Sequence, residues 1–125
     1  MNAVRSKYRG TTKYFHVLAE LVRAAQYRGI TTYQDVALIM GLPPTGSHMG
    51  KEVGWVLGEI SEDEVTAGRP MLSSVAVDVR GKVGEGFFGL ARQLGRLTET
   101  ADTTAFLEAE RLATYQAWRR PLPAK

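Results

Sequence analysis

The spacing of apolar residues along the first half of the chain predicts three helices. A first helix is expected from Thr11-Thr12, which can cap it, to Gly29, because apolar residues recur between them every three or four positions. Residues 32–35, with the sequence TYQD, have the form of a capping box and predict a second, short helix. A third helix is expected over residues 47–60, where apolar positions form one stripe.

This third helix carries an unusual set of glycines. Gly50, Gly54 and Gly58 lie four residues apart and would share one side of the helix. Each glycine costs a helix about 1 kcal/mol relative to alanine, so something should offset them. The usual reason is the close approach of another backbone, and a neighbouring helix is the favoured candidate over a nucleic-acid strand.

The second half of the chain contains turn and strand signals. Residues 61–70 predict an acidic, turn-prone loop. The alternating valines of residues 74–79 predict a half-buried strand, and Arg80-Gly81-Lys82 predicts a turn. Residues 83–86 can return as a second strand, so a small β-hairpin is expected. Two C-terminal helices complete the pattern, one from Phe87 to about Gly95 and one over about residues 102–118.

The predicted order of elements defines the expected fold class. The fold is α+β and mainly helical, of a winged helix-turn-helix type in which helices precede a small β-hairpin and C-terminal helices follow. In such folds the third helix enters a groove of DNA and the hairpin flanks it. The 125 residues are the size of one domain, with a basic N-terminal arm (1–10), a winged-helix-like core (11–97) and a C-terminal helix (98–120).

Composition excludes several classes of function. The chain is 44% hydrophobic and 23% charged, which is ordinary for a globular protein. It has no cysteine, so disulfides, thiolate metal sites and a cysteine nucleophile are excluded. No apolar run is long enough for a bilayer and the start lacks a secretory signal, so a cytoplasmic protein without membrane contact is expected.

Charge is distributed unevenly along the chain, although the net charge is only +3. Residues 1–28 hold six basic side chains against one acid, and residues 29–64 hold six acids against one lysine. Residues 65–97 return to five basic side chains against two acids. Basic segments attract nucleic acid by counterion release, and they can equally be ordinary surface charge.

Four motifs between Thr31 and Leu97 carry a family resemblance through their shared order. They are TYQDVA at 32–37, GLP at 41–43, KEVG at 51–54 and PMLS at 70–73 with its valine-rich continuation to Gly81; GFFGL at 86–90 is a looser match. TYQDVA resembles (Ser/Thr)-Tyr-(Gly/Gln)-x-(Leu/Ile/Val)-Ala, GLP resembles the turn after that helix, KEVG resembles Arg-Ala-Val-Gly, PMLS resembles Pro-Cys-His-Arg, and GFFGL resembles a glycine-rich loop. All of these are motifs of the DNA-binding domain of the O6-alkylguanine-DNA alkyltransferases and their alkyltransferase-like relatives.

The resemblance implies DNA binding without methyl transfer. Tyr33 stands where the family has a tyrosine that pushes a phosphate during nucleotide flipping, and Lys51 stands where an arginine enters the base stack. Met71 and Leu72 stand where the family has the methyl-accepting cysteine and the histidine after it. A thioether has no thiolate to attack an alkyl group, so the repair reaction is not implied.

We therefore expect a non-enzymatic protein that binds duplex DNA and needs no cofactor or metal. The third helix would meet bases or backbone, the turn of the hairpin would act as a wing on phosphates, and the arm would add affinity independent of sequence. The expected contacts are Tyr33, Ser47, His48 and Lys51 on the helices, Arg80 and Lys82 in the turn, and Arg5, Lys7, Arg9 and Lys13 in or beside the arm.

Two other functions stay open at this stage. A protein-protein interaction module on the same fold would use the glycine face of the third helix, the acidic segment 59–64 and Trp55. That acidic segment also argues against simple DNA binding, because it would repel phosphate near the expected interface. A metal-dependent nuclease, using Asp78 and Lys82 with Glu52 or Glu59, is less favoured because the usual acid-x-lysine spacing is absent.

Overall fold

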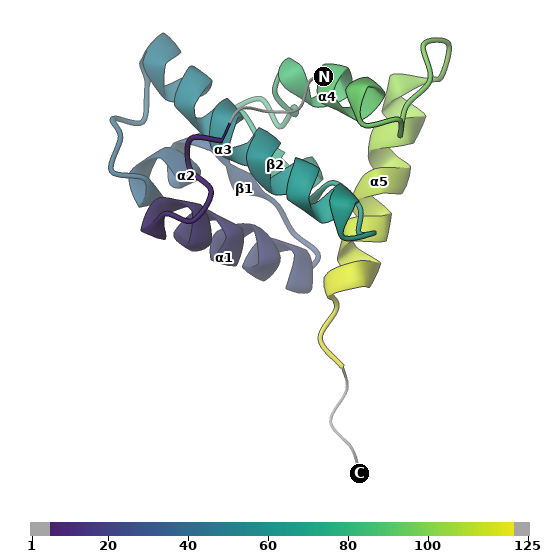
Figure 1. Ribbon diagram of the computed structural model, residues 1–125, viewed down its shortest axis with the longest axis horizontal. Coiled ribbons are helices and arrows are strands. Elements are labelled where there is room, and N and C mark those ends of the chain that lie inside the picture. The colour runs from purple at the N-terminus through teal and green to yellow at the C-terminus, as the bar shows by residue number, and fades with distance from the viewer. Residues whose placement is uncertain (1–5, 122–125) are drawn as a thin grey trace.

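The computed structural model describes residues 6–121, which fold mainly into α-helices (Figure 1). Helices α1 and α3 run side by side, α5 crosses one end of this pair, and α4 packs near the start of α5 (Figure 1). The elements are α1 (Thr12–Gln26), β1 (Thr31–Thr32), α2 (Tyr33–Ile39), α3 (Gly46–Thr66), the 3-10 helix η1 (Leu72–Val75), β2 (Ala76–Val77), α4 (Gly86–Gln93) and α5 (Thr103–Trp118).

Side-chain caps fix the starts of three helices. The hydroxyl of Thr11 accepts the N–H of Tyr14 at 3.2 Å, and that of Thr32 accepts the N–H of Asp35 at 3.1 Å. Asp102 caps α5 by accepting two backbone N–H groups of its first turn. These hydrogen bonds satisfy donors that a helix start leaves unpaired. The predicted starts of the first, second and last helices are confirmed.

The helical spacing of apolar residues in α1 predicts a core position for Phe15, and this prediction is wrong. Tyr14, Val17 and Leu21 are buried, whereas Phe15 is 56% exposed. Apolar residues occupy two adjacent sides of this helix, so periodicity alone did not decide between them. The hydroxyl of Tyr14 donates a hydrogen bond to Asp63 of α3, so the buried side of α1 is the side that faces α3.

Helix α3 is longer than predicted. It continues to Thr66, through the residues that we expected to form an acidic loop. Glu59 and Glu64 are buried in it and hydrogen-bonded. The prediction of a solvated loop was wrong, because these carboxylates find partners inside the fold and therefore do not need water.

The predicted β-hairpin is absent from the described residues. Strand β2 pairs in parallel with β1, with Thr31 opposite Ala76 and Thr32 opposite Val77. The residues before β2 form the 3-10 helix η1, which contacts α1, α3 and α5 and is covered on every side. The valine alternation predicted a half-buried strand, whereas residues 74–77 are wholly buried and Val79 is 78% exposed. The fold is mainly helical with a small two-stranded sheet.

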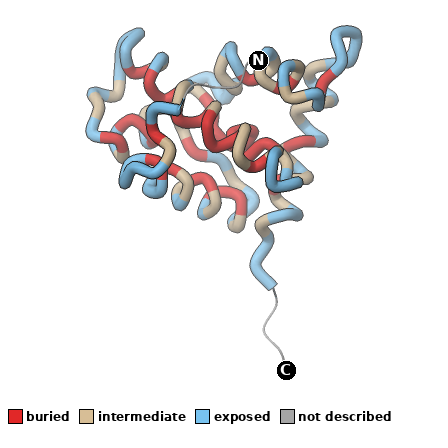
Figure 2. Tube along the Cα trace, viewed as in Figure 1, coloured by how far each residue is buried: buried red, intermediate tan, exposed pale blue. Residues whose placement is uncertain are grey.

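Two hydrophobic clusters form the core, and the buried positions follow the inward sides of the helices (Figure 2). The larger cluster joins α1, α2, α3 and η1. The smaller one contains Met71, Phe87, Ala91 and Leu97, with residues of α5 packed against it. The edge between α3 of the first cluster and α4 of the second is not filled by side chains, and the candidate site lies there.

Candidate nucleic-acid interface

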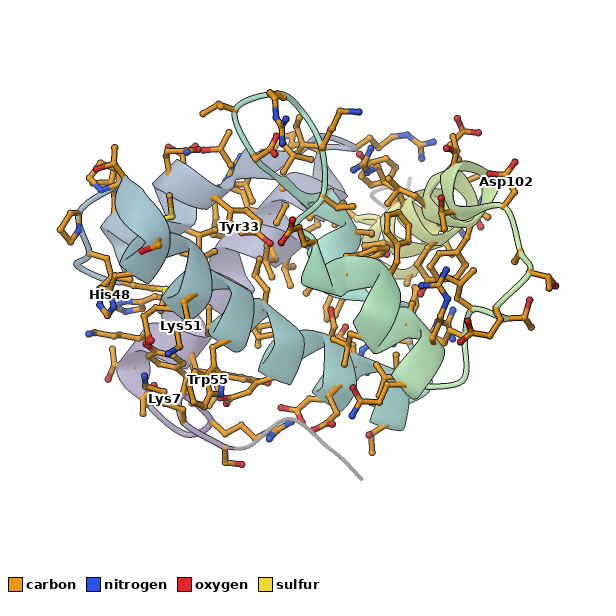
Figure 3. The ribbon with its side chains drawn as sticks, turned by 90° about the horizontal axis from the view of Figure 1, so that it is seen from above. Lys7, Tyr33, His48, Lys51, Trp55 and Asp102 are labelled. Atoms are coloured by element: carbon orange, nitrogen blue, oxygen red, sulfur yellow. The ribbon has the colours of Figure 1, made fainter. Side chains whose placement is uncertain are left out.

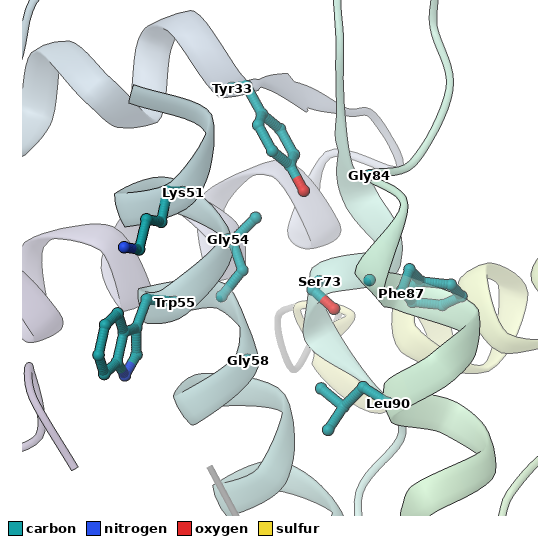
Figure 4. A pocket seen from close by; sticks show the side chains of 11 residues that line it. Tyr33, Lys51, Gly54, Trp55, Gly58, Ser73, Gly84, Phe87 and Leu90 are labelled. Atoms are coloured by element: carbon teal, nitrogen blue, oxygen red, sulfur yellow. The ribbon is translucent and has the colours of Figure 1, made fainter. Parts of the chain in front are cut away.

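A cavity of about 430 Å³ lies between α3 and α4 (Figure 4). Gly54 and Gly58 of α3 form one wall, and Phe87 and Leu90 of α4 form the opposite wall. Cavities of this size are typical of sites for small ligands. The remaining lining residues are Tyr33, Lys51, Trp55, Leu57, Ser73, Gly84 and Gly86.

The glycines of α3 provide space in this cavity. A Cβ atom added at Gly50 or Gly54 would meet no atom within 4 Å. Our prediction that another backbone packs closely against this side is therefore wrong at these two positions. Gly54 and Gly58 instead line the cavity. Glycine destabilises a helix, but at these positions the absence of a side chain leaves the wall of the cavity open.

Tyr33 closes one side of the cavity from the start of α2. Its phenol packs so tightly against Gly84 that a Cβ atom there would lie 2.0 Å from the Tyr33 oxygen. Burial raises the pKa of Tyr33, the charge of Asp78 raises it further, and a hydrogen bond from the Gly84 backbone acts in the opposite direction. The phenol therefore keeps its proton at neutral pH.

Ser73 of η1 is a polar group in the cavity that the sequence did not single out as a contact. Its hydroxyl points into the cavity (Figure 4) although the residue is only 7% exposed. It is hydrogen-bonded to Ser61 of α3, at 2.7 Å between the two hydroxyl oxygens. The sequence offered no signal for this pairing, because twelve residues separate the two serines.

The outer face of α3, defined here as Ser47, His48, Lys51, Gly54 and Trp55, leads to this cavity. The first four residues are exposed and Trp55 is half-buried. His48, Lys51 and Trp55 follow one another along this side of the helix (Figure 3). Lys51 and Trp55 also line the mouth of the cavity (Figure 4). The structure thus brings four of the predicted contacts, Tyr33, Ser47, His48 and Lys51, to one region.

Residues 78–85, called the loop here, hold the other two predicted cations of this region. The Asp78 carboxylate accepts the backbone N–H groups of Arg80 and Lys82 at 2.8 and 3.1 Å, and these bonds lower its pKa. Gly81, with φ +81°, makes the tight turn at the tip. Arg80 and Lys82 are exposed, and Arg80 also lies 3.2 Å from the Asp78 carboxylate. The turn predicted at 80–82 is confirmed.

Residues 7–9 of the basic arm are held against α3 by acidic side chains of that helix. Lys7 Nζ lies 2.6 Å from a Glu52 oxygen, and the Tyr8 hydroxyl donates to the same carboxylate. Arg9 pairs with Asp63 at 2.9 Å and with Glu62 at 2.5 Å. Arg5 lies outside the described residues. Lys7 and Arg9 therefore face carboxylates, which offset the charge that we expected them to offer to phosphate.

Glu59 completes this acidic clamp, which we define as Glu52, Glu59, Glu62 and Asp63. Its fully buried carboxylate accepts the backbone N–H groups of three successive residues, Lys7, Tyr8 and Arg9, at 2.8, 3.1 and 2.7 Å. Glu59, Glu62 and Asp63 of the predicted acidic loop are thus hydrogen-bonded to residues of the arm. The clamp fastens the arm to α3.

A second pocket of about 470 Å³ lies where the arm meets the start of α3. Lys7, Lys13 and His48 line it, so the exposed Lys13 of α1 lies at the same end of the molecule as His48. Lys7 Nζ lies 4.5 Å from the centre of the Trp55 ring, which places the end of the arm beside the outer face of α3.

Residues 6–121 contain no cluster of metal ligands of the kind that the alternative function, a metal-dependent nuclease, would need. No group of three His, Cys, Asp or Glu residues in this part of the chain could hold a metal ion. Asp78, its expected centre, has its carboxylate engaged in the turn of the loop. None of the described helices has the length and apolar content that a membrane span requires.

Comparison with known proteins does not identify a family for this chain. No family model, curated protein or solved structure matches this chain.

Proposed function

We propose that this protein binds duplex DNA through the outer face of α3 and the loop, without catalysing a reaction. In this proposal α3 acts as the recognition helix of a winged-helix-like arrangement and the loop acts as its wing. The observation that carries the proposal is that Lys51 of α3 and Gly84 of the loop line the same cavity. Lys51 lies at the mouth of this cavity, and Arg80 and Lys82 are exposed in the loop whose Gly84 lines it.

The shape of α3 favours the close approach of a nucleic-acid backbone. Gly50 and Gly54 have open space where a side chain would be, and Ser47, His48 and Lys51 are exposed beside them. Hydroxyl, imidazole and ammonium groups donate hydrogen bonds to phosphate oxygens. The acids of the clamp are paired with the arm, and of these acids Glu52 also lies beside His48, with which it lines the second pocket.

The cavity provides room for a base displaced from the duplex. Phe87 and Leu90 offer apolar contacts, and Trp55 at the mouth offers a stacking surface. Extrusion of a base costs a few kcal/mol, which such contacts can offset. Tyr33 stands above the cavity, in the position that the resemblance assigns to phosphate displacement.

Met71 supports the proposal of binding without chemistry. It occupies the place of the acceptor cysteine in the resembling motif, and it is fully buried in the smaller hydrophobic cluster. It does not line the cavity. A buried thioether has a structural role in that cluster and offers no nucleophile to a bound base.

Fluorescence anisotropy with a labelled duplex at two salt concentrations tests the proposal. We expect Lys51→Glu with Lys82→Glu to lower the affinity at low salt at least about tenfold and to reduce the salt slope by about two, because two phosphate contacts are lost. Arg119→Glu with Arg120→Glu, at the far end of α5, changes the net charge equally and serves as the control. Equal affinities for both double variants would remove the proposal.

A further inference from the structure

The end of α1 meets the second half of α5 on a part of the molecule that lies away from the start of α3 (Figure 1). The Tyr115 hydroxyl donates a hydrogen bond to the backbone oxygen of Gly29 at 2.8 Å. Arg120 Nη1 lies 3.4 Å from the Tyr27 hydroxyl oxygen. These contacts join the two helix ends into one surface. We call it the helix-end surface and define it as Tyr27, Arg28, Ile30, Tyr115, Arg119 and Arg120.

The helix-end surface exposes large apolar side chains. Tyr27 is 67% exposed and Ile30 is 49% exposed. Tyr115 is half-buried, with the Arg28 guanidinium 5.6 Å from the centre of its ring. Covering such side chains with a partner removes apolar area from water, which favours association. Tyrosine and arginine are also the residue types enriched among the strongest contacts of protein interfaces.

The charge of this surface is positive. No carboxylate within residues 6–121 forms an ion pair with its arginines, which are Arg28, Arg119 and Arg120. Glu20 of α1 is already paired with Arg23 at 2.8 Å. Glu108 of α5 is exposed, but it lies eleven residues, or about 16 Å of helix, before Arg119. A partner that brings carboxylates to this surface therefore meets arginines without first breaking an ion pair.

Arg28 has a backbone conformation that glycine adopts more easily. It follows the last residues of α1 with φ +57°, in the left-handed region. Glycine is usual at this position after a helix, because a Cβ atom makes the conformation costly. A cation can complement the helix end from its last turn, as Arg23 does, so charge alone does not require an arginine here. Strained residues of this kind cluster at binding sites, which makes Arg28 a candidate contact.

We propose that the helix-end surface binds an acidic segment of a partner protein, in which apolar side chains alternate with carboxylates. The carboxylates accept hydrogen bonds from the three arginines, and the apolar side chains cover Tyr27 and Ile30. A protein segment fits this surface better than a nucleic-acid backbone does, because phosphates would engage the arginines and offer no apolar group to Ile30. The inference is independent of the proposed function, since this surface shares no residue with the outer face of α3 or the loop.

Fluorescence anisotropy with a labelled synthetic peptide tests the inference. The peptide alternates Asp or Glu with Leu or Phe, and a second peptide has Ser at every apolar position. We expect the wild-type chain to bind the first peptide at least about fivefold more tightly, because apolar contacts add to the charge. Arg119→Glu with Arg120→Glu should weaken its binding about tenfold, since two attractive contacts become repulsive. Lys51→Glu with Lys82→Glu changes the net charge equally and should alter the affinity by less than about twofold.

Two single variants test the apolar contact and the strained arginine. Tyr27→Ala leaves the charge unchanged and should weaken peptide binding about fivefold. Phe15→Ala, at an exposed aromatic position of α1 outside the surface, is its control and should leave the affinity unchanged. Arg28→Gly should weaken peptide binding about threefold and leave the melting temperature equal to that of the wild type or higher, because glycine relieves the left-handed conformation.

Several results would overturn the inference. Equal weakening by the two double variants would show attraction to net charge alone. Peptide-induced amide shifts in ¹H–¹⁵N spectra that miss residues 27–30 and 115–120 would place the peptide elsewhere. A lower melting temperature of Arg28→Gly with unchanged peptide affinity would assign Arg28 to the fold. A loss of duplex affinity in Arg119→Glu with Arg120→Glu, without peptide binding, would assign the surface to nucleic acid. Peptide binding by a chain that binds no duplex would support the inference and reject the proposed function alone.

Discussion

The arm and the loop carry the same kind of charge but face different surroundings. Lys7 and Arg9 of the arm lie 2.6 Å from Glu52 and 2.9 Å from Asp63. Arg80 and Lys82 of the loop are exposed around a single carboxylate, which is itself hydrogen-bonded to the backbone of the turn. The number of basic residues in a segment therefore does not measure the positive potential that it offers to a partner.

The acids explain this difference through their place on α3. Glu52, Glu59 and Asp63 are spaced by seven and four residues, so they share one side of the helix. A buried carboxylate needs hydrogen-bond donors, and the arm supplies them from its backbone and its side chains. Residues 7–9 of the arm are thus anchored to α3, while in the loop Lys82 is exposed and Arg80 pairs with Asp78 at the surface.

The largest effect is expected when the clamp is broken at its buried centre. Glu59→Gln replaces a carboxylate that accepts three backbone N–H groups with an amide whose NH₂ group would face some of them. We expect a loss of about 3 kcal/mol in the free energy of unfolding, measured by urea denaturation. Glu108→Gln, at an exposed position of α5, is the control and should change stability by less than about 0.5 kcal/mol. A small effect at Glu59 would mean that the arm is not anchored as described.

A smaller effect is expected when the anchoring of the loop is disturbed. Gly84→Ala would place a Cβ atom 2.0 Å from the Tyr33 oxygen, so the ring or the loop must move. We expect a cost of about 1–2 kcal/mol and altered amide shifts around the cavity. Gly86→Ala, where an added Cβ meets nothing within 4 Å, is the matched control. In a Tyr33→Ala background the cost of Gly84→Ala should largely vanish, and a persistent cost would reject this contact as its cause.

The clamp also predicts a modest pH dependence of the free energy of unfolding. Hydrogen bonds from Lys7 and Tyr8 lower the pKa of Glu52 below its usual 4.5. Because the folded pKa is the lower one, this stabilisation is complete above about pH 4.5 and is lost as the pH falls through the folded pKa. Glu52→Gln should therefore lower stability at pH 6, and the difference from wild type should shrink at pH 3.5. Urea denaturation at both pH values measures it, and a constant difference would contradict the assignment.

Local patterns predicted the local features of the structure. The caps at Thr11 and Thr32 and the turn at 80–82 were predictable because they depend on neighbours in the sequence. The predicted hairpin was wrong because residues 74–77 are buried among helices that are distant in sequence, and β2 pairs with β1 instead. The clamp was missed for the same reason, since about fifty residues separate Glu59 from its donors.

The candidate site was predictable in part. The residues of the outer face of α3 were found because helical spacing brings them together. The cavity was not predictable from the sequence. It forms because α4 lies opposite α3 and Ser73 is hydrogen-bonded to Ser61, and no short-range sequence pattern predicts either contact. The glycines were noticed, yet their role as an open wall depends on what lies opposite.

The most direct measurement compares Lys7→Gln with Lys82→Gln in both stability and DNA affinity. We predict that Lys82→Gln leaves the free energy of unfolding unchanged and reduces the salt slope of duplex binding by about one. We predict that Lys7→Gln lowers stability by up to about 1 kcal/mol and leaves the salt slope close to the wild-type value. An equal loss of salt dependence in both variants, or a loss only in Lys7→Gln, would contradict the distinction between a clamped arm and an available loop.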